Sequence, residues 1–137
     1  MFFQLAKKGN ILIITALLAV FFLGLLAIVI DIGYAYYEQN KLFFAIKAAS
    51  EAGNNIYINY QKNNNSKELS NEQIKKIDDH IREILALNIT KQFANNAEIV
   101  ISNGKIIISA KHKIGLFFAR AINLNSLEIY VSNKNLL

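Results

Sequence analysis

One uninterrupted apolar stretch constrains this chain more than any other feature of its sequence. The stretch from Ile11 to Ile30 reads ILIITALLAVFFLGLLAIVI and contains neither a charged residue nor a proline. A helix of about 20 residues rises about 30 Å, which matches the hydrocarbon core of a lipid bilayer. The sequence therefore predicts a transmembrane helix over residues 11–30.

The charges that flank this stretch indicate its orientation. Lys7 and Lys8 stand directly before it, whereas the first charge after it is Asp31 and the next basic residue is Lys41. Because basic flanks stay on the cytoplasmic side of a membrane, we expect residues 1–10 to form a cytoplasmic tail. The rest of the chain then lies across the membrane, and Asp31 either marks the helix exit or pairs with a cation on a neighbouring helix.

Two kinds of proteolytic processing compete with a permanent anchor. A secretory signal peptide has an apolar core of about 7–15 residues and ends at a small-residue cleavage site, whereas this longer stretch ends in Ile28-Val29-Ile30-Asp31. Cleavage after Gly9, the candidate processing site, would match pilin-like precursors. Those precursors usually carry a glutamate five residues into the mature chain, where this chain has Ile14.

The helix is expected to continue well beyond the membrane, to about Tyr57. The chain has no proline, and a single helix-interior glycine such as Gly33 costs about 1 kcal/mol without breaking a helix. Residues 31–60 are thus predicted to form an extracytoplasmic continuation. Within it, a narrow helix-packing seam packs either on the chain's own domain or on other subunits. Its members recur at spacings of three and four: Leu42, Ala45, Ala49, Ala52 and Ile56.

Residues 61–137 are predicted to form one small extracytoplasmic α+β domain. A polar loop at 61–69 leads to Ser70, which with Gln73 has the spacing of a capping box and opens an amphipathic helix over 71–92.

The C-terminal third of this domain changes to a strand-like pattern. Asn103-Gly104 joins two β-rich runs, which is a strong hairpin signal, and residues 127–132 should add a third strand. Phe117 and Phe118, between the second and third runs, are expected to plug the sheet. The predicted fold class is α+β: a long N-terminal transmembrane helix continues into a pilin-like domain, in which one or two helices pack on a three-stranded antiparallel sheet.

Composition and motifs argue against several functional classes. Without cysteine there is neither a disulfide framework nor a thiolate metal site. The net charge is +5, of which Lys7 and Lys8 supply two, and this is too weak for nucleic-acid binding. His80 and His112 are the only histidines and lack convergent ligands at metal-site spacing. We therefore expect no enzyme activity, no cofactor and no nucleic-acid partner.

Several short motifs stand at the two ends of the chain. The N-terminal motifs are a basic-glycine start, an Asp-x-Gly helix exit and an Ala-rich segment that ends in Ala-Gly; the C-terminal ones are a strand, a Phe-Phe-Ala-Arg block and a closing strand. In this sequence they are Lys8-Gly9-Asn10, Val29 to Tyr36, Ala48 to Gly53, Ile108-Ser109-Ala110, Phe117-Phe118-Ala119-Arg120 and Ile129 to Ser132. In this combination the chain resembles the TadG/TadE-like proteins of the bacterial tight-adherence (Flp) pilus assembly system.

The resemblance implies a membrane-anchored structural or assembly component of such a pilus. The location it implies is the bacterial inner membrane, with a single span, a cytoplasmic N-terminus and a periplasmic or extracytoplasmic C-terminal domain. Its expected partners are membrane lipid and other pilin-like subunits that pack through helices, and a homo-oligomer is compatible with it. The alternative function is an anchored binding module unrelated to pili, in which Lys111, Lys113 and Arg120 would bind an anionic envelope component.

Overall fold

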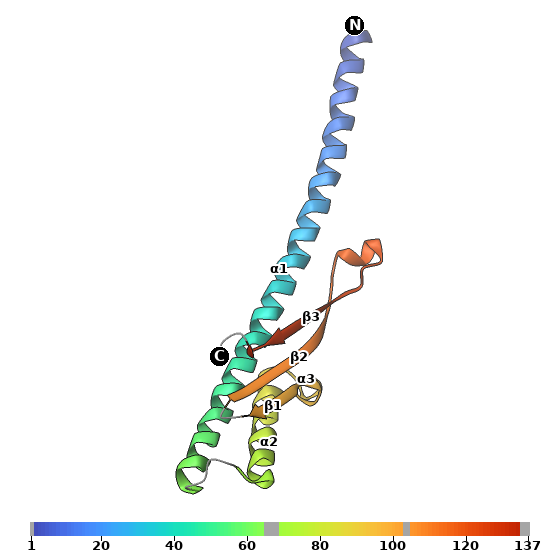
Figure 1. The fold of residues 1–137 in the computed structure, drawn as a ribbon. Coiled ribbons are helices and arrows are strands. Elements are labelled where there is room, and N and C mark those ends of the chain that lie inside the picture. Colours follow the sequence, from blue (N-terminus) through green and yellow to red (C-terminus); the bar gives the residue numbers. More distant parts are fainter. Residues whose placement is uncertain (1, 65–68, 103–104, 135–137) are drawn as a thin grey trace.

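The fold is built on one helix that runs through nearly half of the sequence. The computed structural model describes residues 2–64, 69–102 and 105–134, and the first helix, α1 (Phe2–Asn64), has 63 residues. At 1.5 Å per residue this helix is about 95 Å long. Figure 1 shows its N-terminal half extending free and its C-terminal half carrying the rest of the chain. The helix therefore continues past the predicted end near Tyr57 without a break.

Two further helices follow α1. Helix α2 (Asn71–Asn88) runs back alongside α1, and the short helix α3 (Lys91–Asn96) follows it. The predicted capping box is present, because Ser70 Oγ accepts from the Gln73 N–H at 3.3 Å and Gln73 Oε1 accepts from the Ser70 N–H at 3.0 Å.

The predicted single helix over 71–92 is wrong at its C-terminal end. Ile89 leaves the helical conformation at φ −128° and ψ −88°. The Thr90 side chain then accepts from the Phe93 N–H at 3.2 Å and caps the new helix α3.

Three strands form one antiparallel sheet in the order β1-β2-β3. Strand β1 (Glu98–Ser102) pairs with β2 (Lys105–Gly115), and β2 pairs with β3 (Ser126–Ser132). The register places Ser102 opposite Lys105, while Asn103-Gly104 itself lies outside the described residues. The prediction of an α+β chain with helices on a three-stranded antiparallel sheet is thus confirmed.

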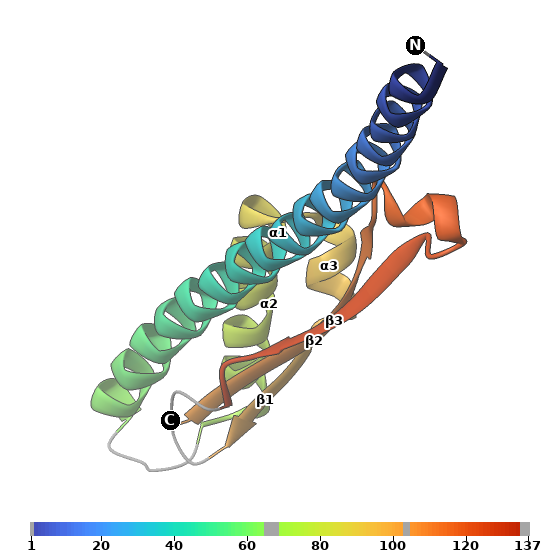
Figure 2. The same ribbon diagram turned by 90° about the horizontal axis from the view of Figure 1, so that it is seen from above.

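The hydrophobic core lies between the sheet, α2, α3 and the C-terminal half of α1 (Figure 2). Ile106 and Ile108 of β2 and Ile77, Ile81 and Leu85 of α2 have no exposed surface. Alternation along β2 turns its even-numbered residues toward the helices, as expected for a sheet with one covered face.

Gly53 of α1 lies directly against side chains of α2 and of the sheet. A Cβ atom at Gly53 would lie 2.7 Å from Ile81 Cδ1 and 2.9 Å from Ile106 Cδ1. No side chain therefore fits at this position unless its neighbours move.

Candidate membrane-proximal site

The site begins at the point where the apolar stretch of α1 ends. Asp31 is 5 % exposed, and its carboxylate accepts hydrogen bonds from three consecutive backbone N–H groups. Phe117 N donates to Oδ1 at 2.8 Å, Phe118 N donates to Oδ2 at 3.0 Å, and Ala119 N donates to Oδ2 at 2.7 Å. The carboxylate thereby joins α1 to a segment that lies 86 to 88 positions farther along the sequence.

The donors belong to the connection between β2 and β3, residues 116–125, which we call the tip. The tip contains a short 3₁₀-helix, η1 (Ala119–Ile122), and is closed by a hydrogen bond from Leu116 N to the Asn125 carbonyl at 3.2 Å. Asn123 ends η1 with a φ of 62°, in the left-handed region that asparagine tolerates better than most residues. The Tyr34 and Phe117 rings meet edge to face at a centroid distance of 5.1 Å, which adds a second contact between α1 and the tip.

The surroundings of Asp31 favour its charged form. Burial alone would raise the pKa of this carboxyl, but the hydrogen bonds from the three N–H groups and the positive charge of Arg120 together hold its pKa below the ordinary value of 3.8. Asp31 is therefore an anion at neutral pH, and its charge is balanced by amide dipoles and by Arg120.

Two open apolar grooves meet at the tip. The span groove, of about 480 Å³, lies between the tip and the stretch of α1 from Phe21 to Ile28; the tip lines it with Phe118, Ala121 and Ile122. The exit groove, of about 490 Å³, lies between the tip and α1 farther along, from Ile28 to Gln39, and is also lined by Leu127 and Ile129 of β3. The tip thus overlaps lengthwise with the second half of the predicted span.

The prediction that Phe117 and Phe118 plug the sheet is wrong. Phe117 is 62 % exposed and Phe118 is 49 % exposed, whereas the preceding residue, Leu116, is buried. The backbone N–H groups of Phe117 and Phe118 donate to Asp31, and this contact holds the two residues beside α1 instead of in the core.

The other predicted site residues lie along α1. Ile11 and Ile30 at the ends of the apolar stretch are exposed, and Gly33 is exposed with open space around its Cα. Side chains of α1 are described from Asn10 onward, so Lys7, Lys8 and Gly9 lie outside that part.

The predicted seam lies against the chain's own domain. Leu42, Ala45 and Ala49 are buried, and Ala52 and Ile56 are half-buried. Of the two uses that the sequence left open for this seam, packing on the domain is the one observed.

Two polar residues that the sequence analysis did not single out, Asn133 and Ser50, hold the C-terminal end of β3 in place. Asn133 is 3 % exposed, and its Nδ2 donates to Ser50 Oγ on α1 at 2.8 Å and to the Ile106 carbonyl at 2.9 Å. Its Oδ1 accepts from Ile108 N at 2.8 Å. The end of β3 is therefore tied both to β2 and to α1.

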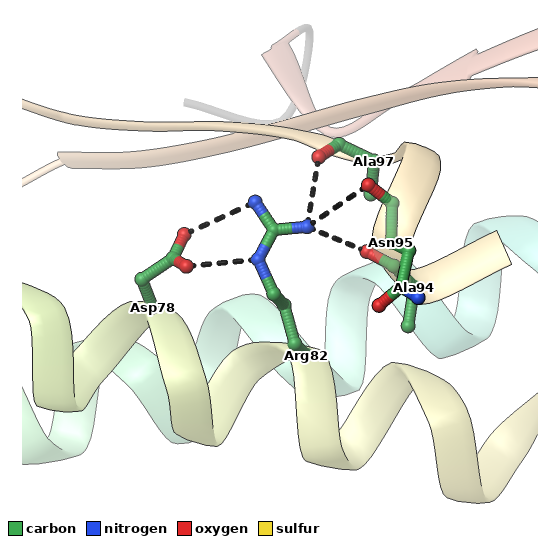
Figure 3. Close-up of polar contacts among 5 residues, drawn as sticks. All are labelled: Asp78, Arg82, Ala94, Asn95 and Ala97. Carbon is green, nitrogen blue, oxygen red and sulfur yellow. Dashed lines mark hydrogen bonds and ion pairs between the residues drawn. The ribbon is translucent and has the colours of Figure 1, made fainter. Parts of the chain in front are cut away.

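Arg82 performs a similar structural role between α2 and α3 (Figure 3). Its Nε donates to Asp78 Oδ2 at 2.8 Å, and its Nη1 donates to the Ala94 carbonyl at 2.7 Å and the Asn95 carbonyl at 3.3 Å. A third carbonyl, that of Ala97, lies 3.4 Å from the same nitrogen. Because these carbonyls end α3, the cation satisfies acceptors that the short helix leaves open.

The two histidines have separate partners. His80 lies 3.6 Å from Glu83, and the His112 ring packs on the Phe93 ring at 5.7 Å. Over residues 10–63, 69–102 and 105–134, whose side chains the structure describes, no group of three acidic, histidine or cysteine side chains converges as a metal site would require. Lys111 and Lys113, considered as anion ligands, share their sheet face with Glu128, which lies 3.6 Å from Lys111 and opposite Lys113 in the register.

By length and composition, α1 is the one helix in the described part of the chain that could cross a membrane, and none of its apolar window is buried inside the structure. No family model, curated protein sequence or solved structure matches the chain.

Proposed function

We propose that this protein is a membrane-anchored, pilin-like structural or assembly component of the TadG/TadE type, with a single span in a bacterial inner membrane. The observation that carries the proposal is a continuous helix whose apolar half stays outside the core while its other half carries a folded domain. An apolar helix surface of this length requires lipid or other helices around it.

The connection between the two halves supports a structural role. The domain is fixed to α1 by its core, by the Asp31 contact near the membrane and by Asn133 near the far end. A domain held in this way moves together with its helix, as a filament subunit or a component of an assembly platform must.

A second surface of α1 is free for helix packing with other subunits. Tyr37, Phe44 and Ile58 are exposed, and their spacings of seven and fourteen residues place them on one side of the helix. We call these three residues the outer stripe. Since the seam from Leu42 to Ala49 is occupied by the chain's own domain, the outer stripe is the surface that we assign to subunit contacts.

The first test is the mass of the N-terminal peptide of the protein purified from membranes of its native host. An intact N-terminus would support a permanent anchor. A start at Asn10 would support processing after Gly9 and place the apolar half of α1 in a filament core. A start beyond Ile30, or release of the protein from membranes by alkaline carbonate, would refute the proposed anchor.

Subunit packing has its own test, because the chain contains no cysteine and a single introduced thiol is unique. Phe44→Cys should give disulfide-linked or cross-linked products in native membranes. Lys75→Cys, on the exposed face of α2, is the matched control and should remain uncrosslinked. Absence of products from Phe44→Cys, or equal products from both variants, would contradict packing through the outer stripe.

A further inference from the structure

We propose that the tip, residues 116–125, is a second membrane contact, which inserts its apolar side chains into the outer leaflet of the bilayer that α1 crosses. This inference rests on the proposed function, because it requires α1 to be a membrane anchor. It assigns to the β2–β3 connection a partner of defined chemistry, the interface between lipid headgroups and acyl chains.

The position of the tip along α1 is the first argument. The span groove brings Phe118, Ala121 and Ile122 beside α1 between Phe21 and Ile28. These α1 residues precede the end of the apolar stretch, Ile30, by two to nine positions, or about 3–14 Å at 1.5 Å per residue. If residues 11–30 fill the hydrocarbon layer, the tip reaches the depth at which interfacial segments place their apolar side chains. Figure 1 shows the tip extending beyond the rest of the domain toward the N-terminal half of α1.

The side chains of the tip are the second argument. Phe117 and Phe118 are exposed, Ile122 is 74 % exposed and Leu124 is 48 % exposed. Bulky apolar side chains gathered at one end of a domain are unfavourable in water but suit the boundary between headgroups and acyl chains. Arg120 is the single charged residue in the run LFFARAINLN. Its long side chain can bring the guanidinium to lipid phosphates while the neighbouring residues remain deeper.

The hydrogen bonds of the tip are the third argument. A backbone segment that contacts hydrocarbon needs internal partners for its N–H groups, because no water is present there to accept them. Asp31 accepts from residues 117 to 119, and the N–H groups of Ala121, Asn123 and Leu124 donate to carbonyls within the tip. The Asp31 carboxylate therefore supplies acceptors that this irregular segment would otherwise have to find in water.

The occupant we infer is lipid because the surface of the tip is continuous with the surface of the span. Ile28, Ala119 and Ile122 line both grooves. A bilayer around α1 at the level of Ile28 would thus meet the tip at the same depth, without a separate docking step. A second copy of the chain seated on the tip is the competing occupant, and the experiment below distinguishes the two.

The experiment measures the depth of single labelled cysteines in the full-length protein, reconstituted into vesicles of phosphatidylcholine and phosphatidylglycerol. Separate samples carry an environment-sensitive fluorophore at Ile122→Cys on the tip, at Leu18→Cys inside the span, or at Leu87→Cys on α2. Leu87 is a matched control, since it is 80 % exposed and apolar but lies on the domain away from the tip. Lipids with a nitroxide near the headgroup end of the acyl chain or, in separate vesicles, near its methyl end serve as quenchers, so that both shallow and deep labels are detected.

We expect loss of fluorescence at Leu18→Cys and Ile122→Cys and none at Leu87→Cys. Quenching at Leu18→Cys without quenching at Ile122→Cys would overturn the inference and leave the membrane anchor intact. Absence of quenching at Leu18→Cys would instead refute the proposed function. Disulfide-linked dimers of unlabelled Ile122→Cys, together with a lack of quenching in the labelled sample, would identify a second copy as the occupant, against our inference.

Removal of the carboxylate provides a further test of the geometry. In the Asp31→Ala background the tip loses the acceptor of three N–H groups, so we expect quenching at Ile122→Cys to fall while quenching at Leu18→Cys persists. The control for folding of this variant is the resistance of its domain to protease, which should equal that of the parent. Unchanged quenching at Ile122→Cys would contradict the role that we assign to Asp31 in placing the tip.

Discussion

Replacement of Gly53 by alanine tests how closely α1 approaches α2 and the sheet. The added methyl group would lie 2.7 Å from Ile81 Cδ1 and 2.9 Å from Ile106 Cδ1. Both isoleucines are completely buried, so neither can turn toward solvent. Forcing one extra carbon into such a core costs about 1–3 kcal/mol.

The net effect is smaller, because alanine is a better helix former than glycine. The gain from removing a helix-interior glycine is about 1 kcal/mol, which leaves Gly53→Ala destabilised by about 1 kcal/mol. Gly33→Ala is the matched control, since its Cβ would meet nothing within 4 Å. That variant should be as stable as the parent or up to about 1 kcal/mol more stable. The difference between the two variants isolates the packing term.

The assay is urea unfolding of the full-length protein in detergent micelles, measured by pulse proteolysis, which reports on the domain outside the micelle. Ile81→Val removes the Cδ1 atom nearest to the new methyl group and alone should cost about 0.5–1.5 kcal/mol. In the Gly53→Ala background its cost should fall by at least about 0.5 kcal/mol, as expected for residues in contact. Equal stability of Gly53→Ala and Gly33→Ala, or additive effects of Gly53→Ala and Ile81→Val, would refute the argument.

Three other predictions follow from the polar contacts. Asn133→Ala should destabilise the domain by about 1–3 kcal/mol in the same assay, because it leaves the buried Ile108 N–H without its acceptor; a loss equal to that of the exposed control Asn95→Ala would contradict this. Arg82→Lys keeps the charge but loses the forked geometry, so amide hydrogen exchange at Phe93 and Ala94 should accelerate relative to Ile108, and unchanged exchange would show that the fork is dispensable. The pKa of Asp31 is lowered in the folded state. Its contribution to holding the tip should therefore be fully present above pH 3.8 and be lost as the pH falls through the lower folded-state pKa. Amide hydrogen exchange at residues 117–119 reports this loss, and a loss of protection already between pH 7 and pH 5 would contradict that direction.

The sequence predicts those parts of the fold whose causes lie close together in the chain. The apolar run and the absence of proline predict α1, and Ser70 with Gln73 predicts the start of α2. Asn103-Gly104 predicts the pairing of β1 with β2. In each case the deciding interactions join residues a few positions apart, or depend on a periodicity that a window of the sequence contains.

The parts that the sequence analysis missed depend on partners far away in the chain. Nothing near Gly53 announces that Ile81 and Ile106 will approach it. The end of α2 at Asn88 carries no glycine or proline signal, and the break is fixed instead by Thr90 and by Arg82. Hydrophobicity alone placed Phe117 and Phe118 in the core, because the pattern contains no sign that Asp31 binds their amide groups.

Asp31 meets two requirements at one position. A charge directly after an apolar stretch sets where a helix leaves the membrane, and an acceptor at that height is what the N–H groups of the tip need near hydrocarbon. The same carboxylate is thus the first charge after the apolar stretch and the partner of residues 117–119. At the other end of the β2–β3 pair, Asn133 donates to Ser50 of α1. Helix α1 and the sheet are thus joined at both ends of this pair. If α1 crosses a bilayer as we propose, a tilt of the helix would turn the domain with it, and a tip that rests in the leaflet would limit that tilt.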